Sequence, residues 1–399
     1  MNDDRSHPSI ARRNRRDVLG AIVVNGPLSR TEISHHTGLH VASVSRITKS
    51  LIGAELICER TEVSIPGKPG RRFIELELNP EGGYVIGIAI NALEQSVTLA
   101  TIKNERIDRA DLQFENILDT DALIEAIISC AQDMILRNNV SRTRIFGASV
   151  AVTGVIDTKT GAVVTAPTMG WKDVQLREKL SNGLDLDVTV ENLPNAINLA
   201  EHRFGIAADF SSTLLMNTAL GVGSSLLLNG QLHRGLNGSG MLAGEVPLTG
   251  HGEQSARPLN LAAGSRGILV EAGMTVSEAQ QLSPFEATRC HQKLIAEAEK
   301  GDPDIVNAFR KSGRMLGEFM AIAGSVVQPD AFIVSGPLGQ VPAYAQGCKA
   351  ALEARVPEGS LIFRISSMTT QSAARWLAIG TYLIDRDLEL SYLSLSDAA

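Results

Sequence analysis

The segment that most restricts the fold runs from Ser29 to Gly53 and reads SRTEISHHTGLHVASVSRITKSLIG. Ser29, followed three residues later by Glu32, is the pattern of a capping box, which begins a helix. Gly38 then allows a left-handed turn at no steric cost, and a second helix is predicted over 41–53. Two short helices joined in this way are typical of a helix-turn-helix unit. Apolar residues at helical spacing predict one more helix in front of it, over residues 14–25.

The second helix of this unit has the composition of a helix that reads DNA. Small and polar side chains stand near its start, where they can reach base edges in the major groove, namely Ala42, Ser43, Ser45 and Arg46. Lys49 lies one turn further along the helix and is expected to contact phosphate. The pattern therefore predicts a recognition helix.

The residues after Leu51 are similar to two strands around a loop, which is the wing of a winged helix. This loop contains GKPGRR and carries three cations, Lys68, Arg71 and Arg72. Arginine side chains on such a loop suit the narrow, electronegative minor groove of A·T-rich DNA. Spacing, turn glycine and wing together favour DNA binding over a small helical cap that holds no nucleic acid.

Charge is divided unevenly along the chain. Residues 1–72 hold 12 lysines and arginines against 7 aspartates and glutamates, a net charge of +5, within a chain of net charge −7. The remaining residues therefore carry −12. A basic head on an acidic body suits contact with a polyanion. A solvated basic tail would give the same balance, and the motifs within the head favour the polyanion.

The rest of the chain alternates strands and helices, which predicts an α/β fold. Apolar strands are expected at 84–90, 97–102 and 145–152, with an amphipathic helix at 120–138. Further glycine-bearing turns after strands can bring backbone N–H groups to phosphates or sugar hydroxyls, although most such turns are structural.

Composition excludes several classes of protein. With 44% hydrophobic residues among 399, the chain can build large cores, and no apolar run reaches the roughly 18–20 residues of a membrane helix. The first residues lack the apolar stretch of a signal peptide. Four widely spaced cysteines without a CxxC pair argue against a disulfide framework. We therefore expect a cytoplasmic protein without membrane contact.

Six segments, taken in order, carry a resemblance that spans about residues 14–385. They are GKPGRRFIELELNP, ASVAVTGVID, VENLPNAINLAEHRFG, NTALGVGSSLLLNGQLHRGLNGSGMLAGE, LGEFMAIAGSVVQPDAFIVSGPLG and AARWLAIGTYLI. In this order they resemble the ROK family (repressor, open reading frame, kinase), in its repressor branch. The resemblance implies a winged helix-turn-helix DNA-binding domain at 1–78. It also implies an actin-like (ribonuclease H-like) sugar-kinase fold at 79–399, with a hexose cleft, in a homodimer or homotetramer. The first lobe would comprise about 79–190 plus the C-terminal segment, and the second about 191–372.

Two departures from the family's kinase pattern predict that catalysis is lost. Family kinases carry Glu-Asn-Asp, in which the aspartate is the general base; here Glu191-Asn192-Leu193 ends in a leucine, which cannot accept a proton. The first phosphate-binding turn of kinases, DxGGTK, is replaced at 88–93 by IAINAL. Magnesium and phosphates lack their usual partners there. We therefore expect no enzyme activity and no cofactor.

Members of the family that this chain resembles have a zinc site, but this chain lacks the residues that would bind the zinc. Leu248 stands at the position of the family's histidine, and the family's CxCGxxGC cluster is absent. One histidine, His251, with Glu253 does not make a tetrahedral site. We therefore expect no metal and predict that His251 is an exposed loop residue.

For the ligand cleft, the resemblance leaves Asn192 and Glu245 in place as contacts. Leucines replace two of the other polar residues, and the last family glutamate falls near Asn260. A site built for hydroxyl groups loses affinity when such contacts are removed. The ligand is therefore less hydroxylated on that face, or the cleft has lost its small molecule.

Two further residues are candidates for the same cleft. Thr168 stands where the family lines the cleft, although a loop hydroxyl bonded to the backbone is an equal alternative. Trp171 could stack on a sugar ring, but a tryptophan in so aliphatic a protein more often belongs to the core.

The sequence thus predicts a DNA-binding transcriptional regulator, a repressor of carbohydrate uptake or catabolism genes. Its inactive kinase-like cleft would sense a sugar or sugar derivative. Two alternatives stay open. One is an ATP-dependent sugar kinase with a DNA-binding head, and the other is a ligand-independent DNA-binding dimer.

Overall fold

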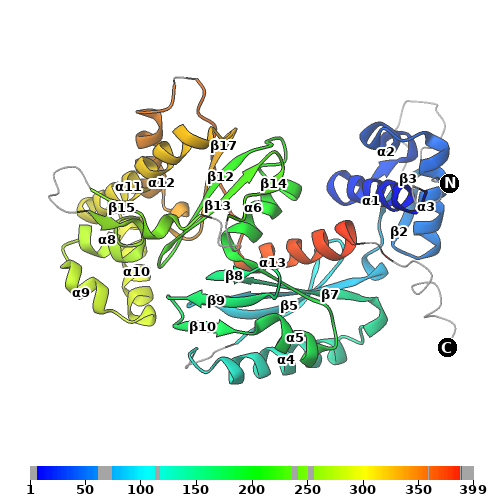
Figure 1. Cartoon of the computed structure of the whole chain (residues 1–399), viewed down its shortest axis with the longest axis horizontal. Coiled ribbons are helices and arrows are strands. Elements are labelled where there is room, and N and C mark those ends of the chain that lie inside the picture. Colours follow the sequence, from blue (N-terminus) through cyan, green and yellow to red (C-terminus); the bar gives the residue numbers. More distant parts are fainter. Residues whose placement is uncertain are drawn as a thin grey trace, which may run out of the picture.

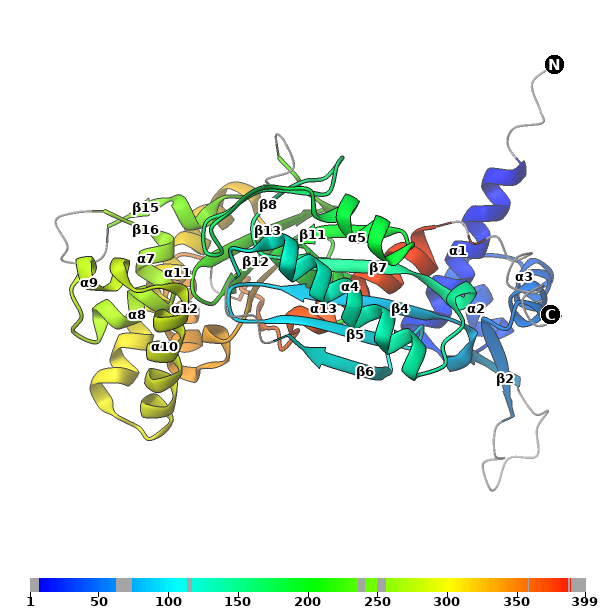
Figure 2. The same cartoon turned by 90° about the horizontal axis from the view of Figure 1, so that it is seen from below.

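A computed structural model describes residues 7–61, 74–112, 117–235, 241–249, 256–357, 359–386 and 388. The molecule is elongated, with a small N-terminal part at one end and two larger sheet-containing parts beside it (Figures 1 and 2). These are called below the winged helix, the first lobe and the second lobe. The mixed α/β architecture predicted from the sequence is confirmed.

The winged helix has the order of elements that the sequence predicts. Its elements are α1 (His7–Asn25), β1 (Leu28–Ser29), α2 (Arg30–Thr37), α3 (Val41–Gly53), β2 (Ile57–Thr61) and β3 (Ile74–Leu78). The strands form an antiparallel sheet in the order β1-β3-β2. Helix α1 begins earlier than the helix predicted from the apolar spacing.

Local capping explains where the two short helices begin and end. The Ser29 side chain accepts from the backbone of Glu32, whose carboxylate accepts from the backbone N–H of Ser29 at 2.8 Å, which completes the capping box. Gly38 ends α2 with φ of 70°, the left-handed conformation that glycine adopts without a steric penalty. Helix α3 spans the predicted residues 41–53.

The first lobe is a five-stranded sheet in the order β11-β7-β4-β5-β6. Its elements are β4 (Tyr84–Ile90), β5 (Gln95–Thr101), β6 (Arg106–Asp111), α4 (Thr120–Arg137), β7 (Ile145–Val152), α5 (Leu176–Leu184) and β11 (Val188–Asn192). A small side sheet contains β8 (Val155–Asp157), β9 (Ala162–Ala166) and β10 (Trp171–Val174). Helices α4 and α5 pack with the large aliphatic side chains on one face of the main sheet.

The second lobe is another five-stranded sheet, in the order β14-β13-β12-β17-β18. Its strands are β12 (Thr213–Thr218), β13 (Val222–Leu228), β14 (Gln231–Leu232), β17 (Ala331–Ser335) and β18 (Phe363–Ile365). Helices α11 (Pro303–Val327) and α12 (Pro342–Glu353) cover one face. The others in this lobe are η4 (Ala243–Glu245), α7 (Leu259–Ala263), α8 (Ser265–Glu271), α9 (Val276–Gln281), α10 (Pro284–Glu299) and η5 (Leu338–Gln340), beside the strand pair β15 (Pro247–Leu248) and β16 (Arg257–Pro258).

Two helices lie between the sheets. They are α6 (Leu193–Phe204) and α13 (Thr370–Ala378), and their alanines pack on Ala151 of the first sheet and on Leu215 and Ile333 of the second. Two sheets with helices between them are the two-lobed arrangement predicted from the resemblance, and the comparisons below confirm it. Within the described ranges, no helix is long and apolar enough to cross a membrane.

The winged helix shares its apolar core with the rest of the chain. Val18, Leu19 and Ile22 of α1 belong to the same buried cluster as Val85 of β4 and Ala100 of β5. The C-terminal residues of this cluster come from the end of α13 and from the π-helical segment η6 (Ile379–Asp385) that follows it. The apolar packing therefore runs continuously across the domain boundary predicted at residue 78.

Candidate functional site

Helix α3 presents the predicted recognition residues on the face that is not buried. Val44, Ile47 and Leu51 point into the winged-helix core. Arg46 and Lys49 are exposed, and the predicted base-contacting serines, Ser43 and Ser45, are half-buried. The exposed face can therefore offer two cations and two hydroxyls to a nucleic-acid groove.

A residue that the sequence did not single out fixes the position of α3. Arg30, at the start of α2, donates its Nε to the hydroxyl of Thr48 at 3.3 Å and pairs through Nη2 with Glu59 of β2 at 2.8 Å. Thr48 is fully buried on α3. One guanidinium thus joins the recognition helix to the strand that leads into the wing. The partners lie 18 and 29 residues away, so no local pattern could have indicated it.

The predicted wing cations, Lys68, Arg71 and Arg72, lie outside the described residues. The strands on either side of them are antiparallel, with Thr61 opposite Ile74. The segment 62–73 therefore joins the ends of two neighbouring strands, which is the position of a wing. Their contact with DNA stays a prediction.

Two of the three predicted ligand residues line one cavity. Thr168, from the turn between β9 and β10, and Glu245, from the second lobe, face a space of about 360 Å³ between the lobes. Asn260 lies beside Glu245 and donates to its carboxylate at 2.9 Å, while its carbonyl accepts from the backbone of Val222 at 2.7 Å. The other lining residues are Pro167, Leu220, Gly221, Pro258, Leu261, Arg266, Gln280 and Pro284.

Asn192, the third predicted ligand residue, does not line this cavity. Its side-chain amide donates to the carbonyl of Gly154, and its backbone N–H donates to Glu191 at 2.9 Å. The buried Glu191 carboxylate also accepts from Asn195 at 3.0 Å and pairs with Arg234 at 2.7 Å. Asn192 and Glu191 thus find partners within the chain, whereas the buried Nη1 of Arg234 has no hydrogen-bond partner among the described residues. Arg234 is a further residue that the sequence analysis missed.

Leu193, the residue in place of the family's general base, begins α6 and is 5% exposed. It belongs to the apolar cluster between the lobes, together with Ala151 and Leu377. The position is thus occupied by a packed aliphatic side chain, and a leucine there has no group that can accept a proton.

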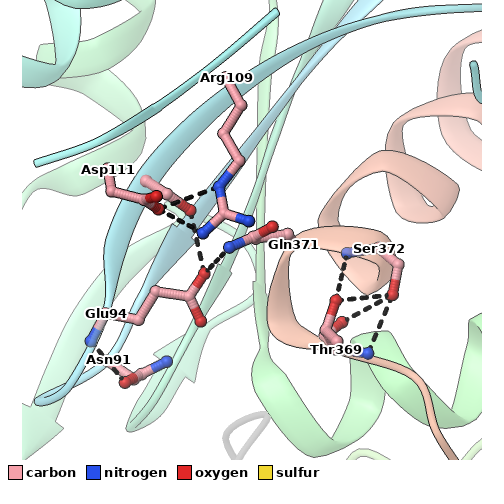
Figure 3. A network of polar contacts seen from close by, with 8 residues as sticks. Asn91, Glu94, Arg109, Asp111, Thr369, Gln371 and Ser372 are labelled. Atoms are coloured by element: carbon pink, nitrogen blue, oxygen red, sulfur yellow. Dashed lines mark hydrogen bonds and ion pairs between the residues drawn. The ribbon is translucent and has the colours of Figure 1, made fainter. Parts of the chain in front are cut away.

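The turn after β4 is bound to the start of α13, as Figure 3 shows. The side-chain Oδ1 of Asn91 accepts from the backbone N–H of Leu93 at 2.9 Å, and its side-chain amide donates to the Thr370 hydroxyl at 3.3 Å. Gln371 donates to the Glu94 carboxylate. The turn that would meet nucleotide phosphates in a family kinase is therefore held by side-chain contacts to α13, and residues 88–93 contain no lysine.

Leu248, from the expected zinc region, lies in the second lobe, and Trp171 lies in the side sheet of the first lobe. Leu248 is in β15, opposite Arg257, whereas His251 and Glu253 lie outside the described residues. Among the residues that are described, no group of three metal-binding side chains could hold an ion. Trp171 is 3% exposed and donates to the carbonyl of Ile117 at 2.7 Å, so it belongs to the core.

Comparison with known sequences gives relatives that are named repressors. The chain is 28% identical to the xylose repressor of Caldicellulosiruptor bescii over 60% of its length. It is 26% identical to that of Bacillus spizizenii over 80% of its length. The matched regions span 59% of the former relative and 81% of the latter.

Solved structures show the same fold. A ROK family transcriptional regulator, described as a homologue of the Escherichia coli MLC protein, superposes with a TM-score of 0.75 at 22% identity, over 96% of this chain and 99% of that one. A ROK family glucokinase from Streptomyces griseus, in complex with glucose and AMPPNP, gives a TM-score of 0.61 at 20% identity, over 74% of this chain and 98% of the kinase. The actin-like fold is thus common to regulators and sugar kinases. The ROK family model matches residues 87–378, and this chain belongs to the ROK family.

Proposed function

We propose that this chain is a DNA-binding transcriptional repressor whose affinity for its operator is set by a sugar or sugar derivative in the cleft. The observation that carries the proposal is helix α3, with Arg46 and Lys49 exposed and not paired with any other described residue. The net charge of +5 over residues 1–72 and the relatives named xylose repressors support it.

We further propose that the chain does not phosphorylate sugars. Leu193 offers no general base, and residues 88–93 lack the aspartate, the glycine pair and the lysine of the kinase pattern. The expected result is no sugar-dependent release of ADP above background in a coupled assay with ATP and magnesium. Release that depends on one sugar would favour a kinase with a DNA-binding head.

The DNA-binding part of the proposal is tested by selection from random duplexes. We expect an enriched site with two related half-sites, because the proposed assembly is a homodimer or homotetramer and repeats its recognition helix by symmetry. Arg46→Ala should relax the base preference at one position in each half-site. Lys49→Ala should weaken all sites alike and reduce the slope of log K against log salt by about 1.

A matched control separates contact from net charge. Arg355 is an exposed cation just beyond α12 in the second lobe, and Arg355→Ala should leave both preference and slope unchanged. The double variant Arg71→Ala, Arg72→Ala tests the wing by the same slope. Failure of the full chain to enrich any duplex would overturn the proposed function.

The ligand part is tested by the thermal stability of the full chain with a panel of pentoses, hexoses and their phosphates. A ligand that binds the folded chain raises its Tm. Glu245→Gln should abolish the shift, while Glu353→Gln, the same change at an exposed residue at the end of α12, should retain it. The same compound must change operator affinity, because an effector acts only through different affinities for two states. A Tm that no compound moves would favour a ligand-independent dimer.

A further inference from the structure

The C-terminal helix pair joins the space between the lobes to the winged helix. We call residues 370–385, which comprise α13 and η6, the C-terminal connector. Its first helix lies between the two sheets, and Figure 1 shows it in red, running toward α1. At the other end, Ile379, Tyr382 and Leu383 are buried with the apolar residues of α1. A Cβ at Gly20 of α1 would lie 3.7 Å from Ile384.

One line of contacts reaches the connector from strand β11. The buried hydroxyl of Tyr382 lies 3.0 Å from the Thr189 hydroxyl, 3.0 Å from the Asp187 carbonyl and 3.1 Å from the Ala148 carbonyl. Because carbonyl oxygens can only accept hydrogen bonds, the Tyr382 hydroxyl donates to them and accepts from the Thr189 hydroxyl. Three residues beyond Thr189, β11 ends at Asn192, and the next residue, Leu193, is packed in the apolar cluster between the lobes.

A second line of contacts reaches the connector along helix α6. This helix begins at Leu193, and its 12 residues span about 18 Å. At its far end, the Phe204 ring stacks on Trp376 of the connector, with centroids 4.2 Å apart and planes 17° apart. Arg203 pairs with Asp385 at 2.8 Å.

The two lines begin at the same corner. Residues 191–193 are the end of β11 and the start of α6, so any displacement of this corner moves both elements. Both elements contact one segment, and the other face of that segment lies in the winged-helix core. Packed interfaces of this kind change between discrete arrangements instead of deforming smoothly. Segment η6 is a π-helix. Such helical segments are rare and often lie at functional positions.

We propose that the C-terminal connector transmits the position of the 191–193 corner to the winged helix, with Tyr382 as the positioning residue. This inference rests on the proposed function, because it describes how cleft and operator surface would influence each other. Linkage makes the influence reciprocal, so operator binding must also change the corner. That direction can be measured without knowledge of the effector.

The first experiment is hydrogen exchange of the full chain with and without the selected duplex DNA. In the wild type we expect the duplex to change exchange of the peptides that cover 188–204. In Tyr382→Phe this change should be lost, although the variant still binds the duplex. Tyr344→Phe is the matched control, because Tyr344 is also fully buried and donates to a carbonyl, that of Ala263 at 2.6 Å, within the second lobe.

The result that overturns the inference is an unchanged response of 188–204 in Tyr382→Phe, or the same loss in Tyr344→Phe. Thr189→Val removes the other partner of the contact and should give the same loss as Tyr382→Phe. An intact response in Thr189→Val would show that the contact between Tyr382 and β11 is not the route of transmission.

A second experiment keeps the inference testable if the chain binds no DNA, which is the failure of the proposed function. Ile22→Val removes one methyl group from the buried face of α1 and loosens it locally. In the otherwise wild-type chain, Ile22→Val should then speed up hydrogen exchange of residues 188–204. In a chain that also carries Tyr382→Phe, it should not. Equal exchange of 188–204 in the two backgrounds would refute transmission through Tyr382.

Discussion

His291 makes the stability of the second lobe depend on pH. It lies on α10 with 4% of its surface exposed, and neither ring nitrogen has a hydrogen-bond partner among the residues that the structure describes. Burial lowers its pKa from 6.5 to about 4. The folded lobe therefore holds the ring neutral where the unfolded chain accepts a proton. Stability is fully present above pH 6.5 and is lost as pH falls toward 4.

The size of this effect follows from the two pKa values. Each pKa unit corresponds to about 1.4 kcal/mol, so the full loss is about 3 kcal/mol below pH 4 and about 2 kcal/mol at pH 5. His291→Leu keeps an apolar side chain in the core and has no group to protonate. We compare the free energy of unfolding of this variant with that of the wild type at both pH values. Relative to the wild type, the variant should be about 2 kcal/mol more stable at pH 5 than it is at pH 7.5.

Urea unfolding at the two pH values, followed by labelling of the Cys348 thiol, measures this difference. Cys348 lies fully buried on α12 in the same core as α10, so its labelling reports opening of the second lobe. His233→Gln is the control, because His233 is exposed and its replacement should leave the pH dependence unchanged. If His291→Leu shows the same pH dependence as the wild type, the reasoning from burial is wrong.

Three further changes should have measurable results. A Cβ at Gly147 would lie 2.6 Å from the Tyr382 ring, so the added methyl group of Gly147→Ala should clash with the connector. This overpacking should destabilise the protein by about 1–3 kcal/mol and lower its Tm, and an unchanged Tm would contradict the packing. Ser29→Ala removes the cap of α2 and should destabilise the winged helix by about 1 kcal/mol, measured as faster exchange of α2. Arg144 is buried, donates to the carbonyl of Ala54 at 3.2 Å and pairs with Glu55 at 2.5 Å. Arg144→Met should therefore increase proteolysis near residue 79, and a protease-resistant variant would refute its role at this junction.

The winged helix was the most predictable part because its signals are local. The capping pair Ser29 and Glu32 lies within four residues, and Gly38 needs only its own backbone conformation. The bounds of α3 therefore follow from the sequence without knowledge of the rest of the fold. The strands 84–90 and 145–152 were predictable for a similar reason, because strands buried on both faces read as apolar runs.

The candidate site was less predictable because its contacts join distant residues. The resemblance indicated Thr168 and Glu245, which share a cavity, but also Asn192, whose amide is taken by a backbone carbonyl. Nothing in the local sequence marks Arg234 as the partner of Glu191. Tyr382 is 193 residues from Thr189, and its apolar neighbours read only as one side of a buried helix.

The shared core has a consequence for how such a protein could be regulated. A DNA-binding head on a flexible linker would keep its own orientation whatever the lobes did, and closure of the cleft would not reach it. Here α1 shares one buried cluster with Tyr382 and Leu383 of the C-terminal connector, so separation of these two segments exposes apolar surface. Exposure of a single aliphatic side chain of this size costs about 1.5–3 kcal/mol. Under the proposed transmission, the C-terminal connector is the element through which a change between the lobes reaches the winged helix, because it packs on α1.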